Sequence, residues 1–461
     1  MGDDAATTGT TGTTASEAAG LRRSVGFVGM LGQSVAGLAP STTPTINIAL
    51  VFAAAGSASW LAYLIGTVAV LLVALTLVPF ARRFAGAGSL SEFVAHGLGP
   101  NARLVTAWAL LLAYLAVPVA TLAGCAAYLE AIFKMAGLSV PTVVLVAVAG
   151  VGAAALALRD VRVSTVLMLA LEGLSMLLVT LLGFAILSRQ GIAVDLSQFS
   201  LDGVSMAGMN SALLICVLSF VGFEAAASLG GEARRPLVDI PRTLLLAPLI
   251  TGVFFVFSAY VIVLGFDRYD IAVATESAPL DHLARALDLP GLGLLVSVGA
   301  AISLFTCVVA TLVASSRVAY ALASRGALPA VLGRLDPVRG APSIAVWVAV
   351  VIGLGFSLTL TSFARPLDVY DWFGTFSTFG CILAYGLTAI AMPIFLRREG
   401  QLRPHHAIVA ALALAVLAYV LYGSVWPVPP APLDVLPWIF VGLMVLGVGG
   451  SVLLGRRAGR G

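Results

Sequence analysis

Apolar segments of about twenty residues recur along the whole chain, and each is long enough to cross a bilayer as a helix. Hydrophobic residues make up 60% of the sequence and charged residues 10%, against roughly 25% charged in an ordinary soluble domain. A water-soluble protein has no core large enough for so much apolar surface, so an integral membrane protein is predicted. Short alternating strands do not occur in the pattern, which favours helices over a barrel.

The apolar pattern predicts twelve transmembrane helices, separated by turn and charge signals. Their expected ranges are 27–53, 58–80, 104–133, 141–158, 163–187, 207–230, 243–265, 293–323, 343–361, 371–396, 407–424 and 434–454. The polar, Thr/Gly/Ala-rich residues 1–21 lack the features of a signal peptide and are expected to form a disordered cytoplasmic tail.

Basic residues indicate the orientation. If the N-terminus is cytoplasmic and twelve helices alternate, most of the 25 Lys and Arg residues lie inside. The exceptions are Lys134, Arg189, Arg268, Arg285 and Arg365. This positive-inside bias predicts a multi-pass plasma-membrane protein with both termini in the cytoplasm. No basic cluster with interleaved aromatic residues occurs, so nucleic acid is not expected as a partner.

The first predicted helix is interrupted by glycine and by Pro40 and Pro44. Proline inside a helix removes a backbone hydrogen bond and clashes with the preceding turn. In lipid, such a break is tolerated only where protein or a water-filled cavity satisfies the freed groups. Residues 34–40 are therefore expected to line a cavity.

The sixth predicted helix has a comparable interruption at residues 219–224, and both interruptions contain S-x-x-G. They lie five helices apart, so they run in opposite directions through the membrane, as an inverted repeat of five helices requires. Free N–H groups and carbonyls at such breaks can bind a carboxylate and an ammonium group. The alternative is that the glycines only allow close helix packing. Phe220 and Phe223 flank the second break and are candidates for lining the pocket.

Two carboxylates lie deep inside apolar runs, Glu172 in the fifth helix and Glu224 after the second break. A charge at this depth is costly, so it needs a partner, a cavity or a proton. Both are candidates for coupling to a proton, and Glu224 is equally a candidate for a structural acceptor. A sodium-coupled alternative would use hydroxyl groups instead, such as those of Ser303 and Thr306.

Cysteine and histidine give no sign of metal or enzyme chemistry. Cys125, Cys216, Cys307 and Cys381 lie singly within apolar runs and are expected to be reduced core residues. No H-E-x-x-H motif or intramembrane histidine occurs, so an embedded enzyme is not expected and no cofactor is predicted.

Two stretches resemble signatures of the amino acid–polyamine–organocation permeases. One is FVGFE at 220–224, followed by GEARRPLVDIPR at 231–242; the other is SSRVAYALASRGALP at 315–329, followed by GAP at 340–342. The resemblance covers roughly residues 22–454. It implies an all-α fold with a five-plus-five inverted repeat like that of the leucine transporter, two additional C-terminal helices, and alternating access.

The halves would then be residues 22–190 and 191–400, with the additional helices in 401–461. The resemblance further implies that the substrate carboxylate meets backbone at the first break and its amine meets carbonyls at the second. The substrate-binding candidates are Ser34, Val35, Ala36, Gly37, Leu38, Ser219, Phe220, Val221, Gly222 and Phe223.

The sequence departs from the family pattern at three places. The first break reads Q-S-V-A-G at 33–37 instead of a Gly-Ser-Gly type run, which leaves a standard α-amino acid substrate open. Leu218 replaces an aromatic gate of some members. Glu172 is the polar residue of the fifth helix, where some proton-linked members have lysine, which leaves the coupling ion open.

The resulting prediction is a secondary transporter for amino acids or small amines, driven by the proton gradient. Exchange and uniport are alternatives, and a sensor that binds the same ligand without moving it is less favoured. The lipid bilayer and a small-molecule substrate are the expected partners, and the oligomeric state is left open.

Overall fold

The computed structural model describes residues 21–190, 196–199, 201, 204–269, 278–337 and 340–458. These residues form helices and turns, and their one β-type contact is a single bridge between Val25 and Ala233. The prediction of an all-α chain is confirmed for this part of the protein.

The helices follow one another along the chain with short connections. The first half contains α1 (Phe27–Leu38), the π-helix η1 (Thr43–Asn47), α2 (Ile48–Ala55), η2 (Gly56–Ala58), α3 (Ser59–Ala81), α4 (Leu90–Leu98), α5 (Pro100–Met135), α6 (Thr142–Ala157) and α7 (Val161–Gln190). The middle part contains η3 (Leu196–Phe199), α8 (Met206–Leu218), η4 (Ala225–Leu229), α9 (Pro236–Tyr269), α10 (Pro279–Ala286) and α11 (Pro290–Ala323). The last part contains η5 (Ala330–Gly333), α12 (Ser343–Thr361), α13 (Pro366–Arg398), α14 (Pro404–Val425), η6 (Leu433–Val435) and α15 (Leu436–Ala458).

Among the described residues, nine helical stretches are long and apolar enough to cross a membrane, and α6 and α8 are shorter apolar helices. One of the nine stretches, Phe27–Ala81, is 55 residues long. It contains both the interruption after α1 and the turn at Gly56, where φ is 55°. Twelve spans and the inverted repeat remain predictions, since length and composition alone do not fix the number of crossings.

The first transmembrane segment is broken, but later than the glycine pattern indicated. α1 is regular through Leu38, residues 39–41 are irregular, and the chain is helical again from Thr42. Ala39 has the left-handed conformation, with φ 47° and ψ 61°. The residue before a proline is disfavoured in the right-handed helical region, so Pro40 ends α1 at Leu38.

The second break lies where the sequence places it. α8 ends at Leu218, residues 219–224 form successive turns, and the chain resumes as the short 3-10 helix η4. Gly222 has φ 102°, which L side chains rarely adopt, so glycine is required at this turn.

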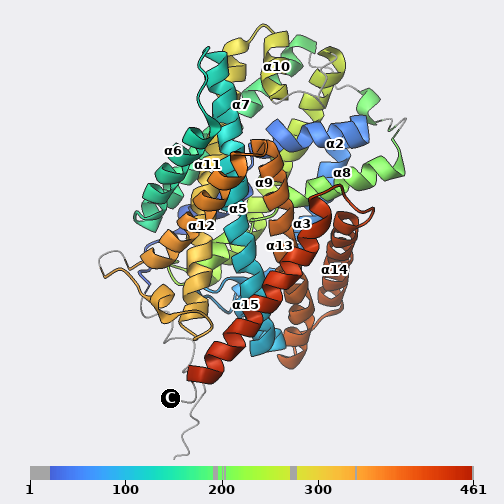
Figure 1. Cartoon of the computed structure of the whole chain (residues 1–461). Helices are drawn as coiled ribbons and strands as arrows, with labels where there is room; N and C mark the ends of the chain where they lie inside the picture. The colour runs from blue at the N-terminus through green and yellow to red at the C-terminus, as the bar shows by residue number, and fades with distance from the viewer. Residues whose placement is uncertain are drawn as a thin grey trace, which may run out of the picture.

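Three long helices, α5, α11 and α13, form the centre of the bundle, with α5 packed against both of the others. Figure 1 shows α10 at one end of the molecule and the C-terminal end of α15 at the other. Ser91 of α4 and Ser451 of α15 line a common pocket, so α4 lies at the same end as the C-terminal part of α15. We name the two ends of the molecule the α10 end and the α4 end. α14 and α15 lie on the outside of the bundle (Figure 1), and the side chains of their apolar windows are mostly exposed, as expected for lipid-facing helices. All four cysteines are buried in the core and lie apart from a disulfide partner in the described structure, and their reduced state stays a prediction.

Candidate functional site

The two breaks contact each other through their backbones at Gly37 and Gly222. A Cβ atom added to Gly37 would lie 2.8 Å from the carbonyl oxygen of Gly222, and one added to Gly222 would lie 2.4 Å from that of Gly37. No larger side chain fits without moving backbone. The glycines therefore do allow close packing, as the alternative interpretation held, and they do so at the cavity itself.

Two side-chain hydrogen bonds also join the broken segments. The backbone N–H of Ala226 donates to Ser34 Oγ at 3.2 Å, and Asn47 Nδ2 donates to Ser219 Oγ at 2.8 Å. Ser219 Oγ in turn donates to the carbonyl of Ile215. These bonds satisfy polar groups that the interrupted helices would otherwise leave free.

A cavity of about 560 Å³ lies at the breaks. Its polar lining consists mainly of hydroxyl groups and one amide, and Asp371 is the one charged side chain among its described lining residues. The lining extends to Pro279 of α10 and Leu367 near the start of α13, so the cavity reaches towards the α10 end. The polar lining residues are Thr42, Thr43, Thr45, Asn47, Tyr114, Thr121, Ser219, Thr311, Tyr370, Asp371, Thr375, Ser377 and Thr378.

Half of the predicted substrate-binding residues line this cavity. They are Gly37, Leu38, Ser219, Val221 and Gly222. Ser34, Val35, Ala36, Phe220 and Phe223 are buried outside the lining.

The two phenylalanines that flank the second break pack into the core. The ring of Phe220 lies 5.1 Å from that of Phe255, and the ring of Phe223 lies 5.4 Å from that of Tyr385, measured between centroids. Both rings therefore pack on the core side of the second break and do not line the cavity.

Several lining residues were not identified from the sequence. Thr42 is buried and its hydroxyl has no hydrogen-bond partner among the described residues. Asn47 follows the first break in η1, while Tyr370 and Asp371 come from α13. The polar residues after Pro40 were a usable signal for the first two, since a break exposes the chain on both of its sides.

Glu172 is fully buried in α7, and its carboxylate accepts two hydrogen bonds from α11. Ser303 Oγ donates to Glu172 Oε2 at 2.9 Å, and the hydroxyl of Thr306 donates to Oε1. Ser303 Oγ also accepts from the backbone N–H of Ser41, within the first break, at 3.3 Å. The sequence suggested Ser303 and Thr306 as ion ligands instead of Glu172; the structure places all three in one network.

Glu224 is fully buried directly before η4. Tyr114 of α5 donates to its Oε1 at 2.7 Å, and Tyr385 of α13 donates to Oε2. Tyr114 also lines the cavity. The carboxylate thus ties the second break to two of the central helices.

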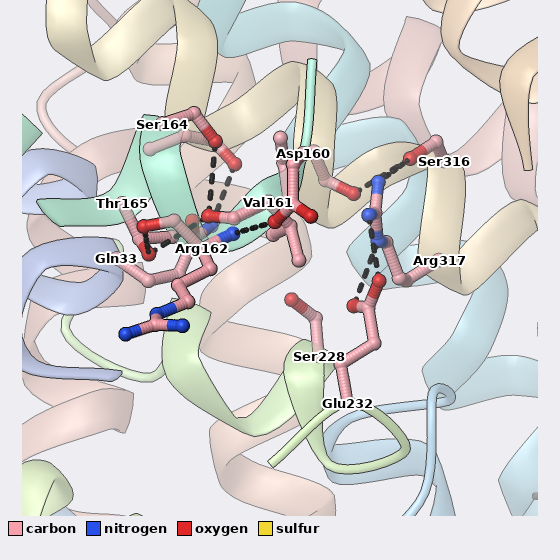
Figure 2. A network of polar contacts seen from close by, with 12 residues as sticks. Gln33, Asp160, Val161, Arg162, Ser164, Thr165, Ser228, Glu232, Ser316 and Arg317 are labelled. Atoms are coloured by element: carbon pink, nitrogen blue, oxygen red, sulfur yellow. Dashed lines mark hydrogen bonds and ion pairs between the residues drawn. The ribbon is translucent and has the colours of Figure 1, made fainter. Parts of the chain in front are cut away.

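At the α4 end the same segments are packed together. The N–H of Val25 donates to the carbonyl of Glu232, and the N–H of Arg234 donates to the carbonyl of Val25. Glu232 accepts two hydrogen bonds from the guanidinium of Arg317, at 2.9 and 3.2 Å, and both side chains are nearly inaccessible to solvent. Figure 2 shows this buried pair, with Arg317 also donating to Ser316.

A second cavity of about 650 Å³ lies at the α4 end. Arg325 and Glu92 form an ion pair at its wall, with 2.7 Å between Nη1 and Oε1. His96 stacks on Phe84, and burial lowers the pKa of His96, opposed by Glu92 and assisted by Arg103.

A packed layer separates the two cavities. Along α11, Thr311 is the last residue that lines the first cavity and Tyr320 is the first that lines the second. Nine residues of helix correspond to roughly 14 Å at 1.5 Å per residue. Arg317 lies between them, and on the N-terminal segment Val25 lies between Leu21 of the second cavity and Gly37 of the first. We name the Val25–Ala233 bridge and the Glu232–Arg317 pair the inner latch.

Comparison with known families agrees with this architecture. The amino acid permease family model matches residues 29–428. The chain belongs to the amino acid permease family. The match includes both breaks, the cavity and the inner latch except Val25.

Relatives of this permease are distant. The branched-chain amino acid permease BcaP of Bacillus subtilis is 20% identical over 250 residues, which cover 52% of this chain and 50% of that protein. Cationic amino acid transporter 4 of Mus musculus is 25% identical over 402 residues, 83% of this chain and 61% of that protein. A probable GABA permease of Pseudomonas aeruginosa is 26% identical over 365 residues, 76% and 74% of the two chains. The chain thus matches only about half the length of BcaP.

Solved structures share the fold. A manganese transporter of Eremococcus coleocola, in a mutant form, matches 94% of this permease with a TM-score of 0.58 and 12% identity. The same transporter in complex with an aromatic bis-isothiourea compound matches 93% with a TM-score of 0.54. At this identity the likeness concerns the fold alone.

Proposed function

We propose that this permease is a secondary transporter that moves an amino acid or a related small amine by alternating access. The observation that carries the proposal is the pair of cavities separated by a packed layer. A substrate that enters from the α10 end reaches the breaks, and it leaves only if the inner latch opens. In alternating access, a barrier closes the path from the substrate site to one side of the membrane while the path to the other side is open.

The breaks supply the chemistry to hold a zwitterion. Carbonyls at the C-terminal end of α1 and in the turns at 219–222 can accept hydrogen bonds from an ammonium group. The hydroxyls of Thr42 and Thr43 and the N–H of Thr43, at the start of η1, suit a carboxylate. Asn47 and Ser219 connect both walls, so substrate binding and the relative position of the breaks are coupled.

Glu172 is the proposed proton-coupling group. Its carboxylate reaches the first break through Ser303, which bonds both to Glu172 and to the N–H of Ser41. Loading or releasing a proton at Glu172 changes which groups can donate in this chain of bonds, and so changes the preference between the two conformations. We favour the proton over sodium, and exchange or uniport remains the second candidate.

The relatives support an amino acid as the substrate class, since their names include branched-chain, cationic and GABA transporters and a serine/threonine exchanger. They also argue for transport rather than covalent chemistry. We place the protein in the plasma membrane with the α4 end in the cytoplasm, as the distribution of basic residues indicates.

The test begins with a thermal-shift screen of the purified protein against amino acids, polyamines and other amines. A ligand that binds only the folded state raises the apparent stability. Each hit is then assayed for uptake into proteoliposomes with and without an inward proton gradient. Gradient-dependent accumulation supports the proposal, counterflow without accumulation supports exchange or uniport, and binding without any flux supports a sensor.

A further inference from the structure

Asp371 is the one charged side chain among the described residues that line the first cavity, and it belongs to neither break. It lies at the sixth position of α13, its side chain is exposed, and it lines the cavity. It forms no hydrogen bond or ion pair with another residue of the described chain. The neighbouring acid, Asp368, is held instead by Arg365, at 2.8 Å between Oδ1 and Nη2.

The lining of the cavity contains no compensating cation. Among the described lining residues no lysine, arginine or histidine occurs, and the remaining polar groups are hydroxyls and the amide of Asn47. A ligand whose far end is anionic would meet an unpaired carboxylate without any cationic side chain. A ligand whose far end is an ammonium or guanidinium group would find its one charged partner there.

The position of Asp371 fixes where that group must be. Thr378 lies on the same face of α13 two helical turns deeper, and it lines the cavity together with Gly222. Seven residues of helix correspond to roughly 10 Å. A basic amino acid or a diamine, bound at the breaks by one amine and extended towards the α10 end, carries its second amine towards the Asp371 carboxylate.

We propose that Asp371 is a specificity-determining residue that selects substrates with a second cationic group, such as basic amino acids or diamines. This inference rests on the proposed function and refines it, since it states which members of the amino acid and amine class the cavity prefers. Asp371 touches the distal amine of the substrate, and it has no part in holding the groups bound at the breaks.

Lysine and norleucine provide a matched pair of substrates, because they differ only at the end of the side chain. Uptake of each into proteoliposomes gives KM for the wild type, Asp371→Asn and Asp368→Asn. We expect the wild type to prefer lysine, and Asp371→Asn to raise KM for lysine about three- to tenfold, as for a partly solvated ion pair. KM for norleucine should stay unchanged, and Asp368→Asn should alter neither value.

The outcomes separate the inference from the function on which it rests. Norleucine uptake with no wild-type preference for lysine, or with an unchanged KM ratio in Asp371→Asn, overturns the role of Asp371 while transport stands. Absence of uptake and of thermal stabilisation for every amino acid and amine rejects the proposed function, and the inference with it. Unchanged norleucine KM in Asp371→Asn shows that the variant is folded.

Discussion

The inner latch offers the sharpest test of the transport mechanism. Glu232→Gln removes the negative partner of Arg317 but keeps the size of the side chain. The guanidinium is then left buried without its counter-charge, in a site where both side chains are almost fully enclosed. We expect the closed α4 end to lose stability relative to a conformation in which Arg317 reaches water.

The magnitude follows from the burial of the pair. Removing one partner of a buried ion pair costs about 3–5 kcal/mol. Every 1.4 kcal/mol changes an equilibrium constant tenfold. If the pair forms only while the α4 end is closed, the ratio of closed to open protein falls by about two to three and a half orders of magnitude.

The shift from closed to open protein can be measured as the rate at which a reagent reaches the first cavity from the α4 end. Thr311→Cys, in a background with the four native cysteines replaced by serine, places a thiol at the inner limit of that cavity. In oriented proteoliposomes, an impermeant thiol reagent added at the α4 face should modify it much faster in Glu232→Gln than in the parent. Glu92→Gln is the matched control, since it breaks the more exposed pair with Arg325 at the same end.

A double variant distinguishes opening of the inner latch from a general loss of fold stability. Glu232→Leu with Arg317→Met replaces the pair by apolar groups, a change that is often neutral in buried sites. The closed state should then be largely restored and the thiol protected again. If Glu232→Gln lowers the melting temperature without changing modification from the α4 face, the pair only stabilises the fold and the reasoning fails.

Two further predictions concern the breaks and the coupling group. Glu172→Gln cannot exchange a proton, so concentrative uptake should be lost while counterflow persists; equal loss of both would remove Glu172 from the coupling role. Gly37→Ala brings a methyl group 2.8 Å from the carbonyl oxygen of Gly222, and overpacking of this kind costs about 1–3 kcal/mol. Its melting temperature should fall below that of Gly355→Ala, where a methyl group meets no neighbour, and equal melting temperatures would mean that the breaks can separate freely.

The sequence predicted the breaks because proline and glycine act locally. Pro40 determines where α1 ends, yet the glycine pattern placed the irregular backbone too early. Gly32 and Gly37 are needed for close approach instead: a Cβ on Gly32 would lie 2.2 Å from the carbonyl oxygen of Thr165. Local composition shows that small residues are required. Only the packed structure shows whether a glycine is needed for a backbone turn or for close contact with a neighbouring helix.

The partners of the two buried carboxylates could be predicted only in part. Ser303 and Thr306 stood out as hydroxyls in an apolar helix, but nothing in the sequence placed them against Glu172. The tyrosines that bind Glu224 lie 110 and 161 residues away. Asp371 was missed for a similar reason, because a long apolar helix does not reveal which of its faces lines a cavity.

The thin layer between the cavities also determines where the membrane voltage acts. Water in both cavities conducts the potential to their inner ends, so most of the voltage drop falls across the roughly 14 Å between Thr311 and Tyr320. One elementary charge that crosses this layer gains or loses about 2.3 kcal/mol per 100 mV. Glu232 and Arg317 carry opposite charges, so a joint displacement of the pair moves no net charge through the field, whereas their separation along the field does. A substrate with a net positive charge adds that charge to the transport cycle, so the membrane potential drives its flux directly. A zwitterion adds none, so voltage acts on its flux only through the coupled proton.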